Sequence, residues 1–214
     1  MTFELTFNRY AATAAERITD VSAMLQRNWR RHGYLPTNEG HARFDLFELA
    51  QLRALGMLAA RGVGPNLGID VSEIIAAGIT LGALRCRGAY EGDAEMLNVE
   101  ADDEATAEMR RAVEAKGMDF GREPLAWGAK ADTFARAAFR GREDFKTYGR
   151  AVPARFFMWF PDGSHRWDNS VDACFRSDRF PTDGPVIVID QHAVGAKMVE
   201  RAPQPFVRVE RSPR

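Results

Sequence analysis

Arginine side chains gather in one short stretch of this sequence, residues 20–36, which read DVSAMLQRNWRRHGYLP. The stretch contains guanidinium groups at Arg27, Arg30 and Arg31, and no acidic residue follows Asp20 within it. A guanidinium can donate two hydrogen bonds to a guanine edge or hold a phosphate, and the side-chain amide of Gln26 can pair with adenine. Because the whole chain has a formal net charge of −1, attraction to nucleic acid has to come from a local patch such as this one.

A helix over about Ser22–His32 is predicted to present these groups. Ser22 is a suitable N-cap because its hydroxyl can accept a hydrogen bond from a free amide, and Gly33 is suited to end the helix. At about 100° per residue, the apolar side gathers Leu25, Trp29 and His32. The other side is expected to carry Ala23, Gln26, Arg27, Arg30 and Arg31. A small residue at position 23 would let the start of the helix approach a base or a phosphate closely.

The neighbouring elements have the order of a winged helix-turn-helix. A short helix that includes residues 11–18 comes first, followed by a turn at residues 19–21. A polar loop at about Thr37–Arg43 carries His41 and Arg43 and is expected to act as the wing. The next helix has a capping box, with Asp45 as the N-cap and Glu48 three residues later. A basic helix face alone is more often merely solvated, and it is this order of elements that favours a helix lying in a DNA groove.

The same run resembles the DNA-binding domain of MerR-type transcription regulators, over about residues 11–65. The positions in phase with that family's pattern are Val21, Ser22, Arg27, Trp29, Gly33, Leu35, Phe44, Asp45, Leu49, Leu52, Leu55, Leu58 and Gly62. The sequence departs from the pattern at Asp20, Gln26, Arg30 and Arg43. The resemblance implies that Arg27 and Trp29 lie near the DNA, and that His41 and Arg43 reach a phosphate or the minor groove. The shared face of Trp29 and Leu25 predicts instead that the indole is buried in the core.

The rest of the chain predicts a second, α+β domain. A helix over about Val71–Arg85 has glycines at 78 and 82, a spacing that lets another helix approach closely. Residues 88–106 hold seven acids and no base, which is typical of a solvated linker. Beyond it we expect helices at about 104–116 and 132–140, a hairpin from Arg155, a strand at Pro185–Asp190, a helix from Gln191 and a last strand. The expected organisation is a winged helix-turn-helix domain at 1–88, an acidic linker at 89–104 and an α+β domain at 105–214.

Other motifs do not predict a catalytic, metal or cofactor site. The two cysteines, Cys86 and Cys174, are too few for a thiolate metal site, and no motif orients Cys174 with His165 or His192. The stretch DQHAVG, residues 190–195, matches a cobalamin-binding signature, but too little chain follows it, so we interpret the match as chance. The aromatic residues of 156–167 are expected to form a sheet core, with an apolar effector pocket or a dimer face as alternatives. We therefore expect no enzyme and no cofactor.

The favoured function is a sequence-specific, DNA-binding transcription regulator of bacterial or phage origin. One small module binds DNA weakly, so a homodimer on double-stranded DNA is expected, with an effector or a protein partner at the second domain. The alternatives are a DNA-recognition component of phage packaging or recombination, and a protein-interaction module that does not bind DNA. The apolar run at 74–84 is too short to span a membrane and no signal peptide is evident, so a cytoplasmic protein is expected.

Overall fold

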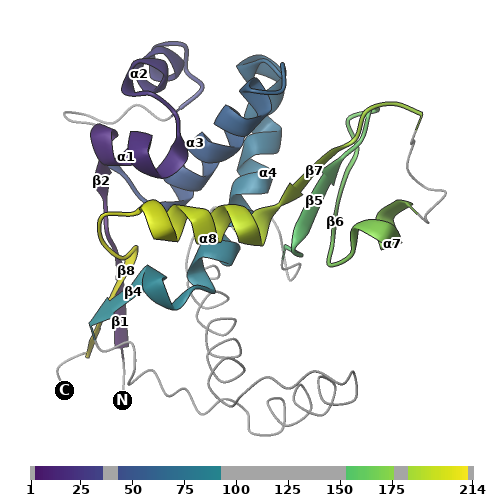
Figure 1. Ribbon diagram of the computed structural model, residues 1–214. Coiled ribbons are helices and arrows are strands. Elements are labelled where there is room, and N and C mark those ends of the chain that lie inside the picture. The colour runs from purple at the N-terminus through teal and green to yellow at the C-terminus, as the bar shows by residue number, and fades with distance from the viewer. Residues whose placement is uncertain (1–2, 36–42, 93–152, 176–182, 212–214) are drawn as a thin grey trace, which may run out of the picture.

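The protein has a mixed α/β fold, seen in a computed structural model that describes residues 3–35, 43–92, 153–175 and 183–211 (Figure 1). The helices are α1 (Ala12–Thr19), α2 (Ala23–Arg31), α3 (Leu46–Ala59), α4 (Pro65–Leu84), the short 3-10 helix η1 (Arg87–Ala89), α7 (Val171–Phe175) and α8 (Gln191–Arg201). The helices predicted at 104–116 and 132–140, His41 and most of the acidic linker lie outside these ranges.

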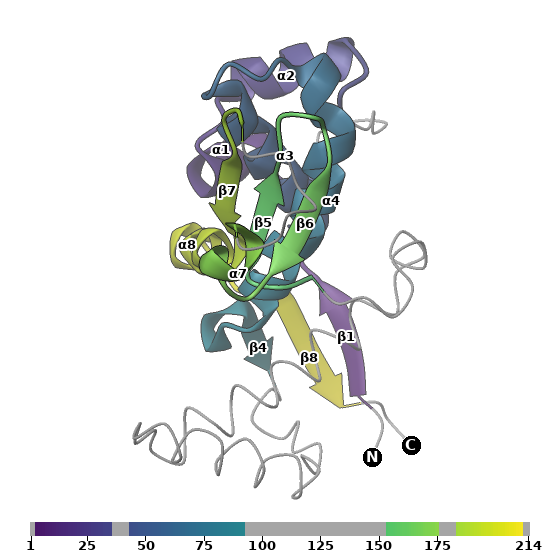
Figure 2. The ribbon, with the colours of Figure 1, turned by 90° about the vertical axis from the view of Figure 1, so that its right-hand side faces the viewer.

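The strands form three small sheets. One sheet has the order β1 (Phe3–Phe7), β8 (Val207–Arg211), β4 (Tyr90–Gly92), with β8 antiparallel to β1 and parallel to β4. A second pairs β2 (Tyr10–Ala11) with β3 (Arg43–Phe44). The third is antiparallel and has the order β6 (His165–Asp168), β5 (Phe156–Trp159), β7 (Ile187–Asp190), as Figure 2 shows. The hairpin, the strand before residue 191 and the last strand were all predicted from the sequence.

Local signals fix the ends of the N-terminal helices, and most of these predictions are confirmed. The Ser22 hydroxyl accepts from the amide of Leu25 at 3.2 Å, so it caps α2. Asp45 and Glu48 form the expected capping box at the start of α3. Gly33 follows α2 with φ +79°, a conformation that suits glycine. The predicted start of α4 at Val71 is wrong, because this helix begins at Pro65, where proline lacks only an amide hydrogen that has no helical partner.

Helix α8 packs against α4 through glycines. A Cβ on Gly82 would lie 2.7 Å from the carbonyl oxygen of Gln191, and one on Gly195 would lie 2.6 Å from the carbonyl oxygen of Ile79. The close approach predicted from the spacing of Gly78 and Gly82 is therefore confirmed, and its partner is α8. Helix α4 is the one helix of the described residues that is long and apolar enough to cross a membrane, but 67% of its most apolar window is buried inside the protein, as expected for a core helix.

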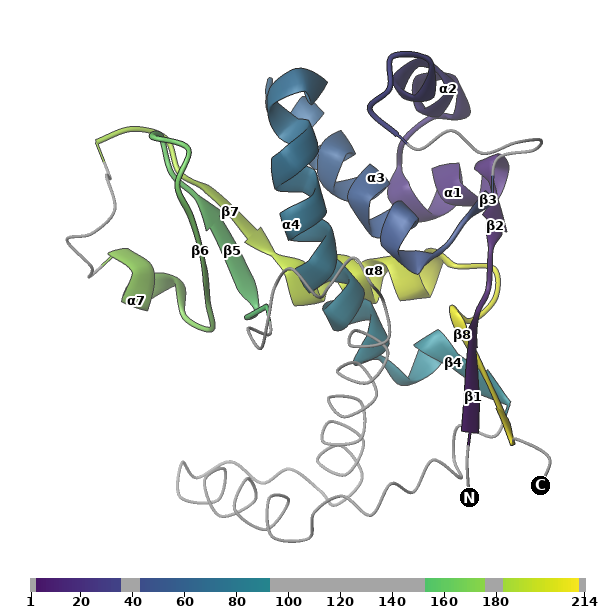
Figure 3. The same cartoon turned by 180° about the vertical axis from the view of Figure 1, so that it is seen from behind.

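Elements from both ends of the chain share one hydrophobic core. Buried side chains of α1, α3 and α4 pack in one cluster with Phe157 of β5, Met198 of α8 and Val209 of β8. The strand β4 lies within the first residues of the expected acidic linker. In Figures 1 and 3 the β1-β8-β4 sheet lies at one end of the molecule and α2 at the other. The core thus holds α2 at the outer edge of the fold.

Candidate nucleic-acid interface

A tight corner joins α1 to α2. Asp20 adopts a left-handed conformation, with φ 59°, and its amide donates to the carbonyl of Glu16. Aspartate tolerates this conformation better than most residues do. It can therefore replace the glycine that the MerR-type pattern has at this position. The Asp20 carboxylate accepts from Arg201 of α8 and, at 3.0 Å, from Arg53 of α3. The corner is thereby tied to two core helices, and the Arg201 hydrogen bond holds the pKa of Asp20 below its usual range.

The first turn of α2 is already occupied by a carboxylate. The amide of Ala23 donates to Oε2 of Glu16 at 3.2 Å, and the amide of Leu25 donates to the Ser22 hydroxyl. A phosphate approaching the start of α2 would meet the negative charge of Glu16. Ser22 acts here as a cap, and the approach of Ala23 to a base or phosphate, which would require Glu16 to move aside, stays a prediction.

Gln26 faces the core and not the solvent. Its side chain is 1% exposed, and Nε2 donates to the carbonyls of Val21 at 2.8 Å and Ala12 at 3.3 Å. Trp29 lies beside it on the same buried face and is 4% exposed. The prediction that Gln26 shares the arginine face is wrong, and so is the implied DNA contact of Trp29, whereas its predicted place in the core is confirmed. Both side chains hold α2 against the body of the protein.

Replacing Gln26 by alanine should therefore destabilise the fold. Two main-chain carbonyls would lose a donor inside the protein, a loss of about 2 kcal/mol in the free energy of unfolding. Urea unfolding followed by circular dichroism measures this change. Asn28→Ala, on the exposed side of the same helix, is the control and should change stability by less than about 0.5 kcal/mol. Equal losses in the two variants would show that the buried face of α2 is assigned incorrectly.

The side chain of Arg30, near the end of α2, packs on an aromatic ring of β3. Its guanidinium carbon lies 4.5 Å from the centre of the Phe44 ring, a cation–π contact that joins α2 to β3. Nε and Nη2 are buried and have no hydrogen-bond partner among the residues that the structure describes. This desolvation lowers the pKa of Arg30, and the nearby charge of Glu48 opposes the effect. Arg30 is half-buried and is placed to position the helix, so it lies only partly on the exposed side where the sequence predicted it.

The exposed face of α2 carries Arg27 and Arg31, one turn apart. Both side chains are exposed, and neither forms an ion pair with an acid in the described parts of the chain. Asn28 lies between them and accepts from Arg31 at 3.3 Å. Met24 completes the face and is 78% exposed. These four residues and Leu25 line a shallow hollow of about 320 Å³.

Met24 and Asn28 are the residues that sequence reasoning missed. Once Ser22 is taken as the cap and Trp29 as buried, the helical repeat places positions 24, 27, 28 and 31 together on the opposite side. That signal was present in the sequence. The polar side chain of Gln26 conceals it, because a glutamine is usually found on the solvent side of a helix.

The region of the predicted wing is only partly described. Arg43 is exposed and belongs to β3, where it pairs with Ala11 of β2, and its carbonyl accepts from Arg9 at 3.3 Å. His41 and the loop at 37–42 lie outside the described residues, so their role as a wing stays a prediction.

The two histidines that were weighed as partners of Cys174 contact an aromatic ring and an arginine. His165 stacks on Phe157 with ring centres 5.6 Å apart, and Nε2 of His192 lies 2.9 Å from the guanidinium of Arg85. Within the described ranges no group of three or more His, Cys, Asp or Glu side chains is placed to hold a metal ion. In the DQHAVG stretch, Asp190 caps α8 and Gly195 packs against α4.

No protein-family model, curated protein or solved structure matches the chain. The geometry of α2 and the resemblance of residues 11–65 are therefore the features that bear on function. The structure brings Arg27 and Arg31 together on one solvent face with Asn28 and Met24, and it places Gln26 and Trp29 in the core and Arg30 against the Phe44 ring. What remains is a compact basic surface on a well-anchored helix.

Proposed function

We propose that the protein is a sequence-specific DNA-binding transcription regulator whose helix α2 lies in the major groove of double-stranded DNA. The observation that carries this proposal is the pair of exposed guanidinium groups, Arg27 and Arg31, which have no acidic partner among the described residues. On most protein surfaces such charges are interspersed with acids. A row of unpaired arginines on one exposed helix face complements a phosphate backbone or the edge of a guanine.

The placement of α2 supports the same function. It follows a corner that is anchored to α3 and α8 through Asp20, so the helix is presented as a rigid element. It also lies at the end of the molecule farthest from the β1-β8-β4 sheet (Figure 1). Helix-turn-helix proteins of the MerR type, which this region resembles, use the second helix of such a corner to enter the groove. The strand pair β2–β3 lies next to this unit, where the wing is expected.

Each protomer offers few phosphate contacts, so the proposal includes a homodimer on a two-fold DNA site. Selection of bound sites from random double-stranded DNA tests it directly, and a palindromic consensus is the expected result. Affinity for the selected site should then fall with salt. If a dimer makes about four phosphate contacts, the loss between 50 and 200 mM salt should be about 100-fold.

The same titration separates the proposal from its alternatives. Binding that ignores both sequence and salt would contradict it and would favour a protein-interaction module. Selection of a non-palindromic site by a monomer, with normal salt dependence, would retain DNA recognition but favour a role in packaging or recombination over that of a dimeric regulator.

A further inference from the structure

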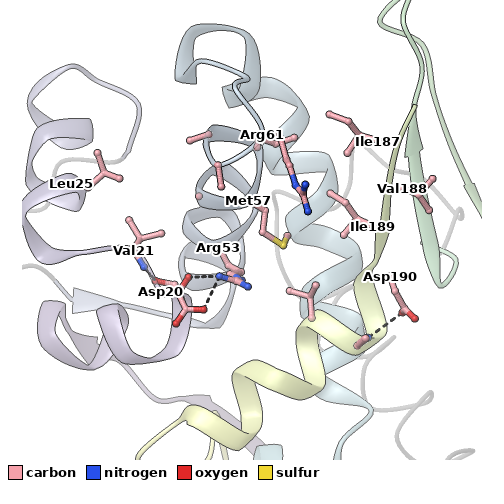
Figure 4. A pocket seen from close by; sticks show the side chains of 17 residues that line it. Asp20, Val21, Leu25, Arg53, Met57, Arg61, Ile187, Val188, Ile189 and Asp190 are labelled. Atoms are coloured by element: carbon pink, nitrogen blue, oxygen red, sulfur yellow. Dashed lines mark hydrogen bonds and ion pairs between the residues drawn. The ribbon is translucent and has the colours of Figure 1, made fainter. Parts of the chain in front are cut away.

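A second hollow lies between the α1–α2 corner and the β6-β5-β7 sheet (Figure 4). Its volume is about 810 Å³, within the range of sites that bind small molecules or short peptide segments. One wall is formed by the corner and the second half of α3, and the other by all four residues of β7 together with the start of α8. Of the three strands of this sheet, β7 is the one whose described residues line the hollow, and it is an edge strand.

The strand register shows which backbone groups of β7 face its free edge. The amide of Gln191 donates to the carbonyl of Arg155, directly opposite, so this pair is a hydrogen-bonded pair of the antiparallel ladder. Such pairs alternate, and Ile189 and Ile187 are therefore bonded to β5. Val188 lies between them, so its N–H and C=O point away from β5, and no described residue bonds to them. The Val188 side chain is itself 40% exposed.

The hollow combines apolar walls with one unpaired cation. Ile187 and Ile189 point into it from β7, and Met57 faces them from α3 (Figure 4). The guanidinium of Arg61 also points into this space and has no acidic partner among the residues described. The other charged residues of the lining are paired, Asp20 with Arg53 and Asp190 with Arg155. An occupant would therefore need apolar side chains and one carboxylate.

We propose that this hollow binds an extended segment of a partner protein, which adds a fourth strand to the sheet at β7. The N–H and C=O of Val188 pair with the backbone of the segment, and its alternate side chains pack on Ile187, Ile189 and Met57. An acidic side chain on the same face of the segment pairs with Arg61. A small organic anion would satisfy Arg61 and the apolar walls but would leave the Val188 edge unexplained. The inference does not depend on DNA binding by α2.

The test uses the full chain and a library of acetylated, amidated pentapeptides. Positions one, three and five, which share the face toward the hollow, hold Val, Ile, Leu, Phe or Glu, and positions two and four hold Thr. The tightest member is then titrated against four forms of the protein: wild type, Val188→Pro, Val188→Ala and Arg61→Gln. Proline removes the outward N–H without removing a bond to β5, whereas alanine keeps that N–H. We expect Val188→Pro and Arg61→Gln each to weaken binding at least about 10-fold, and Val188→Ala to change it less than about threefold.

A change in the ligand gives a readout that cannot arise from misfolding of a variant. Methylating the peptide nitrogen that faces Val188 should abolish binding to the wild-type protein, and the bound peptide should slow hydrogen exchange at the Val188 amide. Octanoate is titrated in parallel. Failure of every library member to bind below 1 mM would overturn the inference, as would peptide binding that is unaffected by Val188→Pro and by N-methylation. Tighter binding of octanoate than of any peptide would assign the hollow to a small anion and overturn the inference as well.

Discussion

Replacing Arg27 and Arg31 together by alanine should weaken binding to the selected DNA site by about 100-fold, or about 2.7 kcal/mol. Both guanidinium groups are exposed on α2 and lack acidic partners in the described part of the chain, so their removal leaves no buried charge unpaired. If each contacts a phosphate, the slope of log affinity against log salt should also decrease by about two for each protomer. If they read bases, the preference for the selected site over random DNA should decrease instead. Fluorescence anisotropy at several salt concentrations measures both quantities.

A control with the same change in net charge distinguishes a local contact from a general loss of positive charge. Lys197 and Arg208 are exposed cations of α8 and β8, on elements away from α2 (Figure 3). The double variant Lys197→Ala, Arg208→Ala should change affinity by less than about threefold, because charges beyond a Debye length of about 10 Å are screened. Equal losses in the two double variants would refute the assignment of α2 as the DNA-contacting helix.

Gly195→Ala should lower the free energy of unfolding by about 3 kcal/mol, the second large effect expected from this structure. In an open helix position the same substitution would raise stability by about 1 kcal/mol, because alanine is the better helix former. Here the added methyl group would lie 2.6 Å from the Ile79 carbonyl oxygen and 2.7 Å from the carbonyl carbon of Gly82. These are main-chain atoms of α4, so relief requires the two helices to separate. Urea unfolding measures the loss.

The control is the same substitution where the neighbours can move. A Cβ on Gly68 of α4 would meet the ends of the Leu55 and Leu58 side chains at 3.3 and 3.4 Å. Gly68→Ala should therefore stay within about 1 kcal/mol of wild type, since those tips can shift by a few tenths of an ångström. A Gly195→Ala protein as stable as Gly68→Ala would show that α8 does not pack on α4 as closely as the structure has it.

Interactions between residues that are close in sequence made much of the fold predictable. The Ser22 cap, the Asp45–Glu48 capping box and the turn before α2 all depend on residues within four positions of one another. The hairpin of β5 and β6 depends on a short turn between two strands, and it too was predicted. Such features depend little on the rest of the molecule, so a single sequence is enough to predict them.

The orientation of α2 was predicted only in part because it depends on distant partners. A glutamine at position 26 looks like a surface residue until the carbonyls of Ala12 and Val21 are placed to accept from it. Arg30 likewise looks free until β3 brings Phe44 beneath its guanidinium. Ala12 and Phe44 belong to other elements, and no spacing within residues 20–36 reveals them. Arg27 and Arg31, by contrast, needed no partner and were placed correctly.

The contacts between the two ends of the chain were also beyond the reach of sequence patterns. The sequence predicted a last strand at FVRVE, but it could not reveal that this strand, observed at Val207–Arg211, lies between β1 and β4. The glycine spacing of α4 predicted a close helix neighbour and left its identity open, and that neighbour is α8. These pairings join residues that are far apart in sequence, where composition and spacing carry no information on partners.

The pairing of Phe3–Phe7 with Val207–Arg211 has a consequence for folding during synthesis. During translation β1 emerges before the other described strands, and it lacks its hydrogen-bonding partner β8 until all of the residues between them have left the ribosome. Contacts of such high sequence separation slow folding, because the entropy of a long loop is lost before they form. An exposed strand edge during that delay is an opportunity for wrong association, so the nascent chain is a natural client for chaperones.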